Sequence, residues 1–262
     1  MAKYRIYQAD AFTSHLFGGN PAAIVPLEEW IPDEQMQKIA AENNLAETAF
    51  LVGRDDHFEL RWFTPELEID LCGHATLASA HILYSEMGYA HDAITFRTQK
   101  AGDLVVTRNG DRYEMDFPAR ITEAVAAPEG LVEALGGPAP VEIRKSRDYF
   151  LVYENEDTIA SMKPDFARLA QIDAIGIIVT APGDSVDFVS RFFAPKAGIN
   201  EDPVTGSAHC NLIPYWAGKL GKKELEAWQI SARKGELLCE DLGERVLMSG
   251  KAVTYLSGEI TI

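Results

Sequence analysis

One short sequence block occurs twice in this chain, and the repeat restricts the fold more than any other feature. Arg61-Trp62-Phe63-Thr64-Pro65 returns 130 positions later as Arg191-Phe192-Phe193-Ala194-Pro195. Each copy is followed by a polar turn, a glycine and a helix rich in small residues that ends near a further glycine, Gly88 or Gly221. A single repeat of this length indicates a duplicated domain rather than a solenoid. We therefore expect two similar halves whose equivalent loops face one another across a cleft.

The composition fits a soluble globular protein with two domains of ordinary size. Of its 262 residues, 47% are hydrophobic and 24% are charged. No apolar run approaches the roughly 20 residues that a membrane span needs, and residues 1–10 alternate like a strand instead of following the plan of a signal peptide. Three cysteines are too few for a disulfide framework. These features predict a cytoplasmic protein.

The charge excludes one class of partner. With 24 basic and 40 acidic residues, the formal net charge is −16, and such a surface repels nucleic acid. A small anionic substrate is still compatible with it, because local backbone dipoles can outweigh a distant, diffuse charge.

The first half predicts strands around one unusual helix. Strands are expected at 4–9, 22–25, 49–52 and 58–63, and a helix opens at 32–34 and runs to about Glu42. The segment from His74 to Met87 has almost no polar face, which indicates a helix buried on most sides. A sheet curled around this helix, with further strands near 94–96, 104–106 and 113–117, is the simplest way to bury it.

The second half repeats this order. We expect strands at 150–153, 175–179 and 188–193, helices at 164–169 and from Ser207, and late strands at 245–248 and 252–255 that complete the second sheet. The predicted fold class is α+β, with two similar domains at 1–118 and 119–262. Each is a curled, mostly antiparallel sheet around a central helix, and the last residues can also pack back on the first domain.

Gly73 and Gly206 occupy equivalent places, each directly before one of the two central helices. A helix start offers unpaired backbone N–H groups and the positive end of a dipole. Two such ends that converge would bind a carboxylate or an enolate without a metal. The alternative is that both glycines only permit tight turns.

Five blocks along the chain together resemble the PhzF-like phenazine-biosynthesis family, which has the diaminopimelate-epimerase-like fold. The resemblance covers essentially the whole chain. It implies an active site between two similar domains, a homodimer, a small carboxylic acid as substrate, and isomerisation by proton transfer without a cofactor. The blocks are Phe17-Gly18-Gly19-Asn20-Pro21-Ala22-Ala23, Asn44-Leu45-Ala46-Glu47-Thr48-Ala49-Phe50, Arg61-Trp62-Phe63-Thr64-Pro65, Cys72-Gly73-His74-Ala75-Thr76-Leu77-Ala78 and Glu201-Asp202-Pro203-Val204-Thr205-Gly206-Ser207-Ala208.

Glu47 is the first candidate catalytic residue. At the offset of 130, its counterpart in the second half is Ile177, so only one half carries a carboxylate there. Burial raises the pKa of a glutamate from about 4.3 toward the range useful for a general acid/base. The alternative is a solvated glutamate before a strand. The resemblance implies that Glu47 removes a proton from carbon and returns it elsewhere.

His74 and Asp202 are the next candidates. A helix start lowers the pKa of a histidine and favours a neutral, hydrogen-bonding ring; His74 can also be a cap or a satisfied buried histidine, and Asp202 can simply orient a turn. The resemblance implies that both assist proton transfer. It also implies that Gly206 and Ser207 hold the substrate carboxylate, with further substrate contacts from Gly19, Asn20 and Gly73.

The cysteines separate this chain from related racemases, which use one thiol from each half. Cys72 stands where the first thiol belongs, but Thr205 occupies the place of the second and cannot supply a thiolate. Cys72 is either reactive at its helix start or a small buried residue. Cys210 and Cys239 are interpreted as core residues.

No metal site is predicted. His74 and His81 lie two turns apart on one helix, and no carboxylate or further cysteine completes a set with Cys72 at the usual spacing. Ser207 and His209 do not form a nucleophilic pair either, because neighbours at i and i+2 on a helix point apart.

The sequence therefore predicts a cofactor-independent isomerase that performs a 1,3-shift or an epimerisation on a small carboxylic acid, with Glu47 as general acid/base. Two alternatives stay open. One is a binding or interaction protein that keeps the fold without turnover, and the other is a one-thiol epimerase that uses Cys72. The residues do not identify the substrate.

Overall fold

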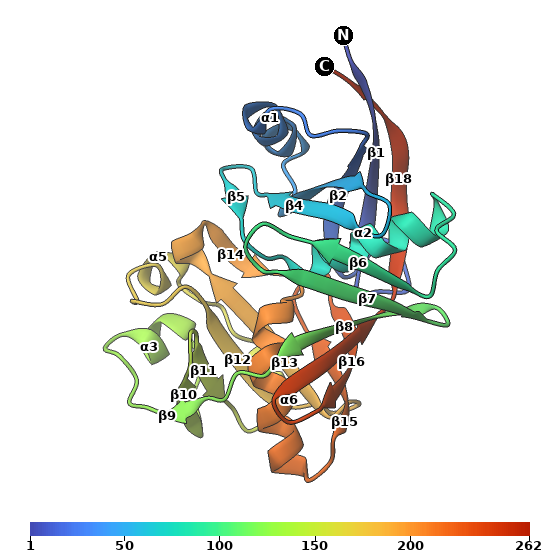
Figure 1. The fold of residues 1–262 in the computed structure, drawn as a ribbon. Helices are drawn as coiled ribbons and strands as arrows, with labels where there is room; N and C mark the ends of the chain where they lie inside the picture. Colours follow the sequence, from blue (N-terminus) through green and yellow to red (C-terminus); the bar gives the residue numbers. More distant parts are fainter. The chain divides into compact units, whose positions relative to one another are not determined.

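The computed structural model describes residues 1–262, which divide into two units. Unit 1 contains Met1–Asp116 and Ser249–Ile262, and unit 2 contains Phe117–Met248. The first unit thus ends two residues before the boundary expected at 118, and the C-terminal residues lie in unit 1 and not in unit 2. Figure 1 shows the elements of each unit along the chain.

Unit 1 is a curled sheet around helix α2. Its strand order is β18-β1-β2-β3-β4-β6-β7-β8, with the short β5 added to β4. The elements are β1 (Lys3–Ala11), β2 (Asn20–Leu27), α1 (Asp33–Asn43), β3 (Glu47–Gly53), β4 (Phe58–Phe63), β5 (Glu68–Ile69), α2 (Gly73–Ser85), β6 (Ala93–Arg97), β7 (Asp103–Asn109), β8 (Arg112–Pro118) and β18 (Ala252–Thr261).

Helix α2 is the centre of unit 1, as its apolar sequence predicts. Every residue from His74 to Tyr84 is buried, and the helix contacts β1, β2, β3 and β18. A helix buried on all sides needs no polar face. Its polar side chains bond within the unit instead: the Ser79 hydroxyl donates to the Ala75 carbonyl, and the His81 ring lies between the hydroxyls of Tyr113 and Thr254.

Unit 2 repeats this plan around helix α6. Its elements are β9 (Glu123–Ala124), α3 (Leu131–Leu135), β10 (Glu142–Lys145), β11 (Tyr149–Val152), α4 (Glu156–Ala160), α5 (Phe166–Leu169), β12 (Ile177–Pro182), β13 (Phe188–Ala194), the 3-10 turn η1 (Pro195–Ala197), β14 (Ile199–Asp202), α6 (Gly206–Leu220), β15 (Glu224–Gln229), β16 (Gly235–Asp241) and β17 (Arg245–Gly250). The ring of Trp216 on α6 stacks on Phe188, and its N–H donates to the Thr180 hydroxyl.

The strand pairings of the two units match one for one. In unit 1, β2 and β3 are parallel, β3 and β4 antiparallel, β4 and β6 parallel, and β6 and β7 antiparallel. In unit 2, β11 with β12, β12 with β13, β13 with β15, and β15 with β16 follow the same sequence of directions. The expected pair of curled sheets around central helices is confirmed.

The register corrects the predicted counterpart of Glu47. Thr48 pairs with Phe63, whereas Ile177 pairs with Phe193, so Ile177 corresponds to Thr48 and Gly176 corresponds to Glu47. The offset of 130 fails here because the second hairpin has one residue more in its loop. A Cβ at Gly176 would lie 2.2 Å from the Phe192 ring. A side chain at this place in unit 2 would therefore require the Phe192 ring to move, and unit 2 carries none where unit 1 carries a carboxylate.

Two further expectations differ from the structure. Residues 252–255 do not complete the second sheet, because β18 pairs antiparallel with β1 along its whole length, from Lys3 with Thr261 to Ala11 with Ala252. Strands β15 and β16 were not predicted. In both, buried and exposed residues alternate, but residues such as Glu226 and Glu240 weaken the apolar signal.

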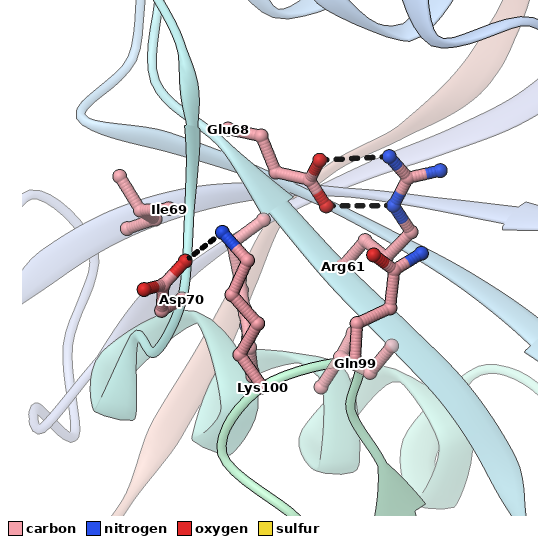
Figure 2. A pocket seen from close by; sticks show the side chains of 8 residues that line it. Arg61, Glu68, Ile69, Asp70, Gln99 and Lys100 are labelled. Atoms are coloured by element: carbon pink, nitrogen blue, oxygen red, sulfur yellow. Dashed lines mark hydrogen bonds and ion pairs between the residues drawn. The ribbon is translucent and has the colours of Figure 1, made fainter.

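The duplicated arginines fix the approach to each central helix. Arg61 donates two hydrogen bonds to Glu68 on β5, at 2.7 and 2.8 Å (Figure 2). Arg191 does the same to Glu201 on β14, at 2.7 and 2.9 Å. Each glutamate lies five residues before the glycine that starts the helix. Bidentate pairs of this kind specify geometry as well as energy, so the repeated block positions both helix starts.

Replacing Arg191 with Leu is expected to lower the free energy of unfolding by about 2–4 kcal/mol, because the partly buried Glu201 and two backbone carbonyls lose their donor. Arg191→Lys keeps the charge but not the two-pronged guanidinium, so it should lose part of this stability. Urea denaturation measures both. The exposed Arg97–Asp103 pair supplies the control: Arg97→Leu should change stability by about 0.5 kcal/mol or less. Equal losses of stability in Arg191→Leu and Arg97→Leu would contradict the positioning role of Arg191.

Candidate active site

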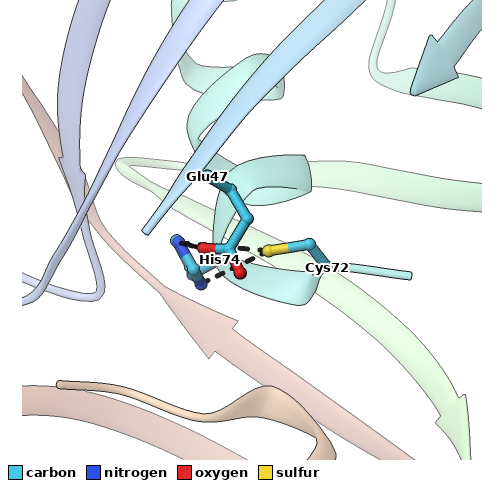
Figure 3. A group of neighbouring side chains, drawn as sticks. All are labelled: Glu47, Cys72 and His74. Atoms are coloured by element: carbon cyan, nitrogen blue, oxygen red, sulfur yellow. Dashed lines mark hydrogen bonds and ion pairs between the residues drawn. The ribbon is translucent and has the colours of Figure 1, made fainter. Parts of the chain in front are cut away.

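Glu47, Cys72 and His74 form one buried cluster in unit 1. Glu47 is the first residue of β3, Cys72 is the N-cap of α2, and His74 lies in the first turn of that helix. Nε2 of His74 lies 3.0 Å from Oε2 of Glu47, and Nδ1 lies 3.4 Å from Sγ of Cys72. Figure 3 shows the carboxylate and the thiol turned toward the same imidazole. The predicted residues Glu47 and His74 are therefore in contact.

The carboxylate of Glu47 is poorly satisfied for a buried group. The residue is 7% exposed, and its Oε2 accepts no hydrogen bond of good geometry. The 3.0 Å contact with His74 is thus a charge contact that lies off the direction of a ring N–H. Glu47 is not the solvated glutamate of the alternative interpretation. A buried carboxylate oxygen with spare lone pairs is available to a ligand.

Asn20 orients the histidine from the other side. This fully buried residue starts β2, and its amide nitrogen lies 3.1 Å from Nδ1 of His74. When the ring is neutral, the amide donates to Nδ1 and the ring proton sits on Nε2, facing Glu47. When the ring is charged, Nδ1 also donates, and the amide oxygen of Asn20 or the thiol of Cys72 accepts.

The electrostatics of His74 differ from the sequence expectation. Burial by itself lowers the pKa of this ring, as does a helix start. The contacts with Cys72 and with the Glu47 carboxylate nevertheless outweigh burial and raise the pKa of His74 well above its usual value. The expectation of a lowered pKa was wrong, because a helix dipole is weaker than a carboxylate in contact with the ring.

The pKa of Cys72 shifts in the opposite direction to that of a reactive thiol. Burial and the neighbouring Glu47 raise its pKa, although His74 works against them. The thiolate is the nucleophilic form, so this environment does not activate the cysteine. Cys210 and Cys239 are buried core residues, as predicted, and burial raises the pKa of the Cys210 thiol to about 11.

The starts of α2 and α6 lack side-chain caps. Neither Cys72 nor Thr205, the two N-cap residues, bonds to the first turn of its helix through its side chain. Gly73 and Gly206 are also absent from the residues with positive φ. Tight left-handed turns therefore do not explain these glycines. Without side-chain caps, the first N–H groups of each helix can serve a ligand.

In unit 2, a polar network holds the predicted Asp202. The Thr205 hydroxyl donates to Oδ2 of Asp202 at 2.5 Å instead of capping α6. Gln229, fully buried on β15, accepts from the Thr205 N–H at 2.8 Å. Its amide nitrogen donates to the Asp202 carbonyl at 2.7 Å and to the Thr205 hydroxyl at 3.1 Å. Gln229 was missed from the sequence because it lies outside every recognised block.

Replacing Gln229 with Leu should lower the free energy of unfolding by about 3 kcal/mol, because buried donors and acceptors around Thr205 lose their partners. Chemical denaturation gives this value directly. The matched control is Gln171→Leu on the surface, which should stay within about 0.5 kcal/mol of the parent. A Gln229→Leu protein as stable as that control would show that the network is not structural.

Ser207 has a cationic neighbour that the sequence did not reveal. Nη2 of Arg147 donates to the Ser207 hydroxyl at 3.1 Å, and the same guanidinium pairs with the buried Asp148. Arg147 precedes β11, 60 residues before Ser207, and no local pattern marks it. The start of α6 thus combines open N–H groups, a hydroxyl and a positive charge, a combination that suits a carboxylate.

Gly19 has a backbone role. It has φ +56°, and a Cβ there would lie 2.0 Å from the Ala11 carbonyl oxygen, so only glycine permits the return from β1 into β2. His81 and His209 are structural. Burial lowers the pKa of His81 and of His209 to about 4, and Nδ1 of His209 bonds to the Thr205 carbonyl and not to Ser207, as predicted.

Comparison with known proteins gives the family. The model of the phenazine biosynthesis-like protein family, PhzC-PhzF, matches residues 9–258. The chain belongs to the PhzC-PhzF family. This confirms the resemblance seen in the sequence blocks. An isomerase of Pseudomonas aeruginosa, named as uncharacterised, is 54% identical over 255 residues, covering 97% of this chain and 98% of that protein. This PhzF-family protein is accordingly an isomerase.

Solved structures agree on the fold. A PhzF-family protein of Enterococcus faecalis superimposes with a TM-score of 0.97 at 48% identity, covering 100% of both chains. A hydroxyproline epimerase of Agrobacterium vitis shares only 10% identity and still reaches a TM-score of 0.60, covering 98% of this chain and 92% of that one. The second likeness shows the fold alone.

Among the helices of this PhzF-family protein, none combines the length and the apolar character that a transmembrane span requires.

Proposed function

We propose that this PhzF-family isomerase moves a proton between two positions of a small carboxylic acid, with Glu47 as the general acid/base. The observation that carries the proposal is the buried Glu47 carboxylate, 3.0 Å from His74, with an oxygen that no hydrogen bond satisfies. Its counterpart in the duplicated unit is Gly176, where a side chain would meet the Phe192 ring. A carboxylate kept in only one of two equivalent units, at a cost in burial, indicates a specialised role.

In the proposed reaction, Glu47 accepts a proton from a carbon next to an electron-withdrawing group of the substrate. The electron pair of the broken C–H bond moves into that group and forms an enolate-like intermediate. In a 1,3-shift, Glu47 then returns the proton to another carbon of the substrate. In an epimerisation, Glu47 keeps the proton and a second acid, His74 or Asp202, protonates the opposite face. Protons and electrons balance within the substrate, so no cofactor takes part.

The other predicted residues bind and stabilise. The backbone N–H groups at Gly73, Gly206 and Ser207 stabilise the negative charge that develops on the substrate. Arg147 is the cation that binds the substrate carboxylate. His74 and Asp202 assist the proton transfer, and Asn20 sets the ring orientation of His74. Both duplicated helix starts suit anions, and an active site between the two domains stays a prediction. A homodimer and a cytoplasmic location stay predictions.

Incubation with a panel of carboxylic acids in D2O tests this function. Partial wash-in of solvent deuterium at one carbon of an accepted acid is the expected result, followed by mass spectrometry or NMR. A panel that includes phenazine precursors and in which no acid exchanges would count against proton transfer and favour a binding protein without turnover.

The one-thiol epimerase is the second candidate. The closeness of Cys72 to His74, at 3.4 Å, is what favours it, whereas the raised pKa of the thiol opposes it. A Cys72→Ala variant that keeps at least about half of the turnover excludes a catalytic thiol. A loss comparable with that of a catalytic base, about 100-fold or more, would support it.

A further inference from the structure

The cluster of Glu47, Cys72 and His74 has the ligand set of a zinc site. Along the sequence, no carboxylate lies at a suitable spacing from Cys72, His74 and His81. The fold supplies that carboxylate from β3, 25 residues before Cys72, and directs His81 away to Tyr113 and Thr254. One ligand atom from each of Glu47, Cys72 and His74 lies within 4.8 Å of the other two.

We propose that this PhzF-family protein binds one Zn2+ ion at Glu47, Cys72 and His74, and that zinc holds the site in a form that cannot transfer a proton. The ligands are the Oε2, Sγ and Nε2 atoms, and the fourth tetrahedral position is left to water or to a carboxylate. Binding itself depends only on the cluster, whereas the inhibitory effect rests on the proposed function of Glu47.

The distances fit a tetrahedral ion after small movements. Zn–N and Zn–O bonds of about 2.1 Å and a Zn–S bond of about 2.3 Å place neighbouring ligand atoms roughly 3.4–3.6 Å apart. Nε2 of His74 lies 3.0 Å from Oε2 of Glu47 and 3.9 Å from Sγ of Cys72. These two separations differ from the ideal by about 0.3–0.4 Å, which side-chain rotation can provide.

Two independent features favour an ion over a proton alone at this place. Oε2 of Glu47 is buried and accepts no hydrogen bond, and its side chain, 9% exposed, faces the imidazole. The amide of Asn20 already lies against Nδ1 of His74 at 3.1 Å. An amide can present its oxygen instead of its nitrogen, so the N–H of a zinc-bound ring would keep a partner, as zinc-bound histidines generally do.

The chemistry also defines which ions are excluded. A thiolate, an imidazole and a single carboxylate suit Zn2+, whereas Mg2+ and Ca2+ require a shell of oxygen ligands. Zinc would displace the thiol proton of Cys72 and any proton on Nε2 of His74 to solvent. Its affinity should therefore fall as the pH falls.

Titration calorimetry of the chelator-treated full chain with zinc chloride tests the site. One ion per chain is expected, with at least tenfold weaker binding in Cys72→Ser and in Glu47→Gln. Cys210→Ser is the matched control, because Cys210 is a buried cysteine of unit 2 outside the cluster, and its affinity should equal that of the parent. Cobalt(II) supplies a second readout: a thiolate-to-metal charge-transfer band that Cys72→Ser abolishes.

Several results would overturn the proposal. These are no zinc binding at one ion per chain, unchanged affinity in both ligand variants, or equal competition by magnesium chloride. Circular dichroism shows whether each variant is folded, and two separate ligand variants keep the test valid if one of them is not. Zinc that binds as expected but leaves deuterium wash-in unchanged would contradict the proposed role of Glu47 and leave the metal site intact.

Discussion

Glu47→Gln is expected to lower kcat by a factor of about 10^2 to 10^4, the usual contribution of a general acid/base, while KM changes little. Glutamine keeps the size and the burial of the side chain at the start of β3 but cannot accept the substrate proton. Deuterium wash-in from D2O should fall by the same factor, because Glu47 must first remove the substrate proton.

The control for Glu47 is a carboxylate with no access to the cluster. Glu66 lies exposed in the turn before β5, and Glu66→Gln should leave turnover and wash-in unchanged. Glu47→Asp retains the carboxylate but withdraws it by one methylene, so it should recover part of the activity. A Glu47→Gln protein with more than about a tenth of the parental kcat would rule out the proposed base.

His74→Gln should reduce kcat by about 100-fold and should also change how stability depends on pH. The folded protein raises the pKa of His74 well above that of the unfolded chain, mainly because Cys72 and Glu47 overcome the effect of burial. The charged ring therefore stabilises the fold fully below the unfolded pKa of about 6.5, and this contribution disappears as the pH rises through the folded pKa. The stability lost in His74→Gln should be about 1–3 kcal/mol near pH 6 and smaller at pH 9.

For His81, on the same helix, we expect the opposite dependence of stability on pH. Burial lowers its pKa to about 4, so the folded protein holds a neutral ring where the unfolded chain becomes charged. The stability lost in His81→Gln should be largest above pH 6.5 and should shrink as the pH falls toward 4. Urea denaturation at several pH values measures both variants. Parallel slopes for the two histidines would contradict the charge environment assigned to His74.

Most of the fold could be predicted because local sequence patterns indicate its strands and helices. The strand at 58–63 and the helix starting beside Gly73 follow from alternation and from an apolar helical face. The repeated arginine block predicted two like units, and its structural role is now clear: Arg61 and Arg191 each clamp a glutamate five residues before a helix start. The sequence allowed the last residues to pack on the first domain, but the pairing of β18 with β1 could not be predicted, because partner choice among strands depends on contacts with residues some 250 positions away.

The candidate site was predicted in its residue types and missed in its contacts. Recognised blocks contained Glu47, His74 and Asp202, but nothing in the sequence indicated that Gln229 would hold Asp202 or that Arg147 would reach Ser207. These partners are 27 and 60 residues apart. Isolated glutamines and arginines carry no periodic signal, so only the folded chain reveals what they contact.

The sequence by itself determined the family, the duplicated plan and the candidate catalytic residues, because these depend on short blocks and on helix and strand periodicity. Only the tertiary structure decided that Gly176 and not Ile177 is the counterpart of Glu47 in the second unit. It also decided that Cys72 and Glu47 lie beside the same imidazole, that of His74. The physical reason is that a single extra loop residue shifts the strand register. The charge on His74 then depends on neighbours within 4 Å in space, at whatever distance along the chain.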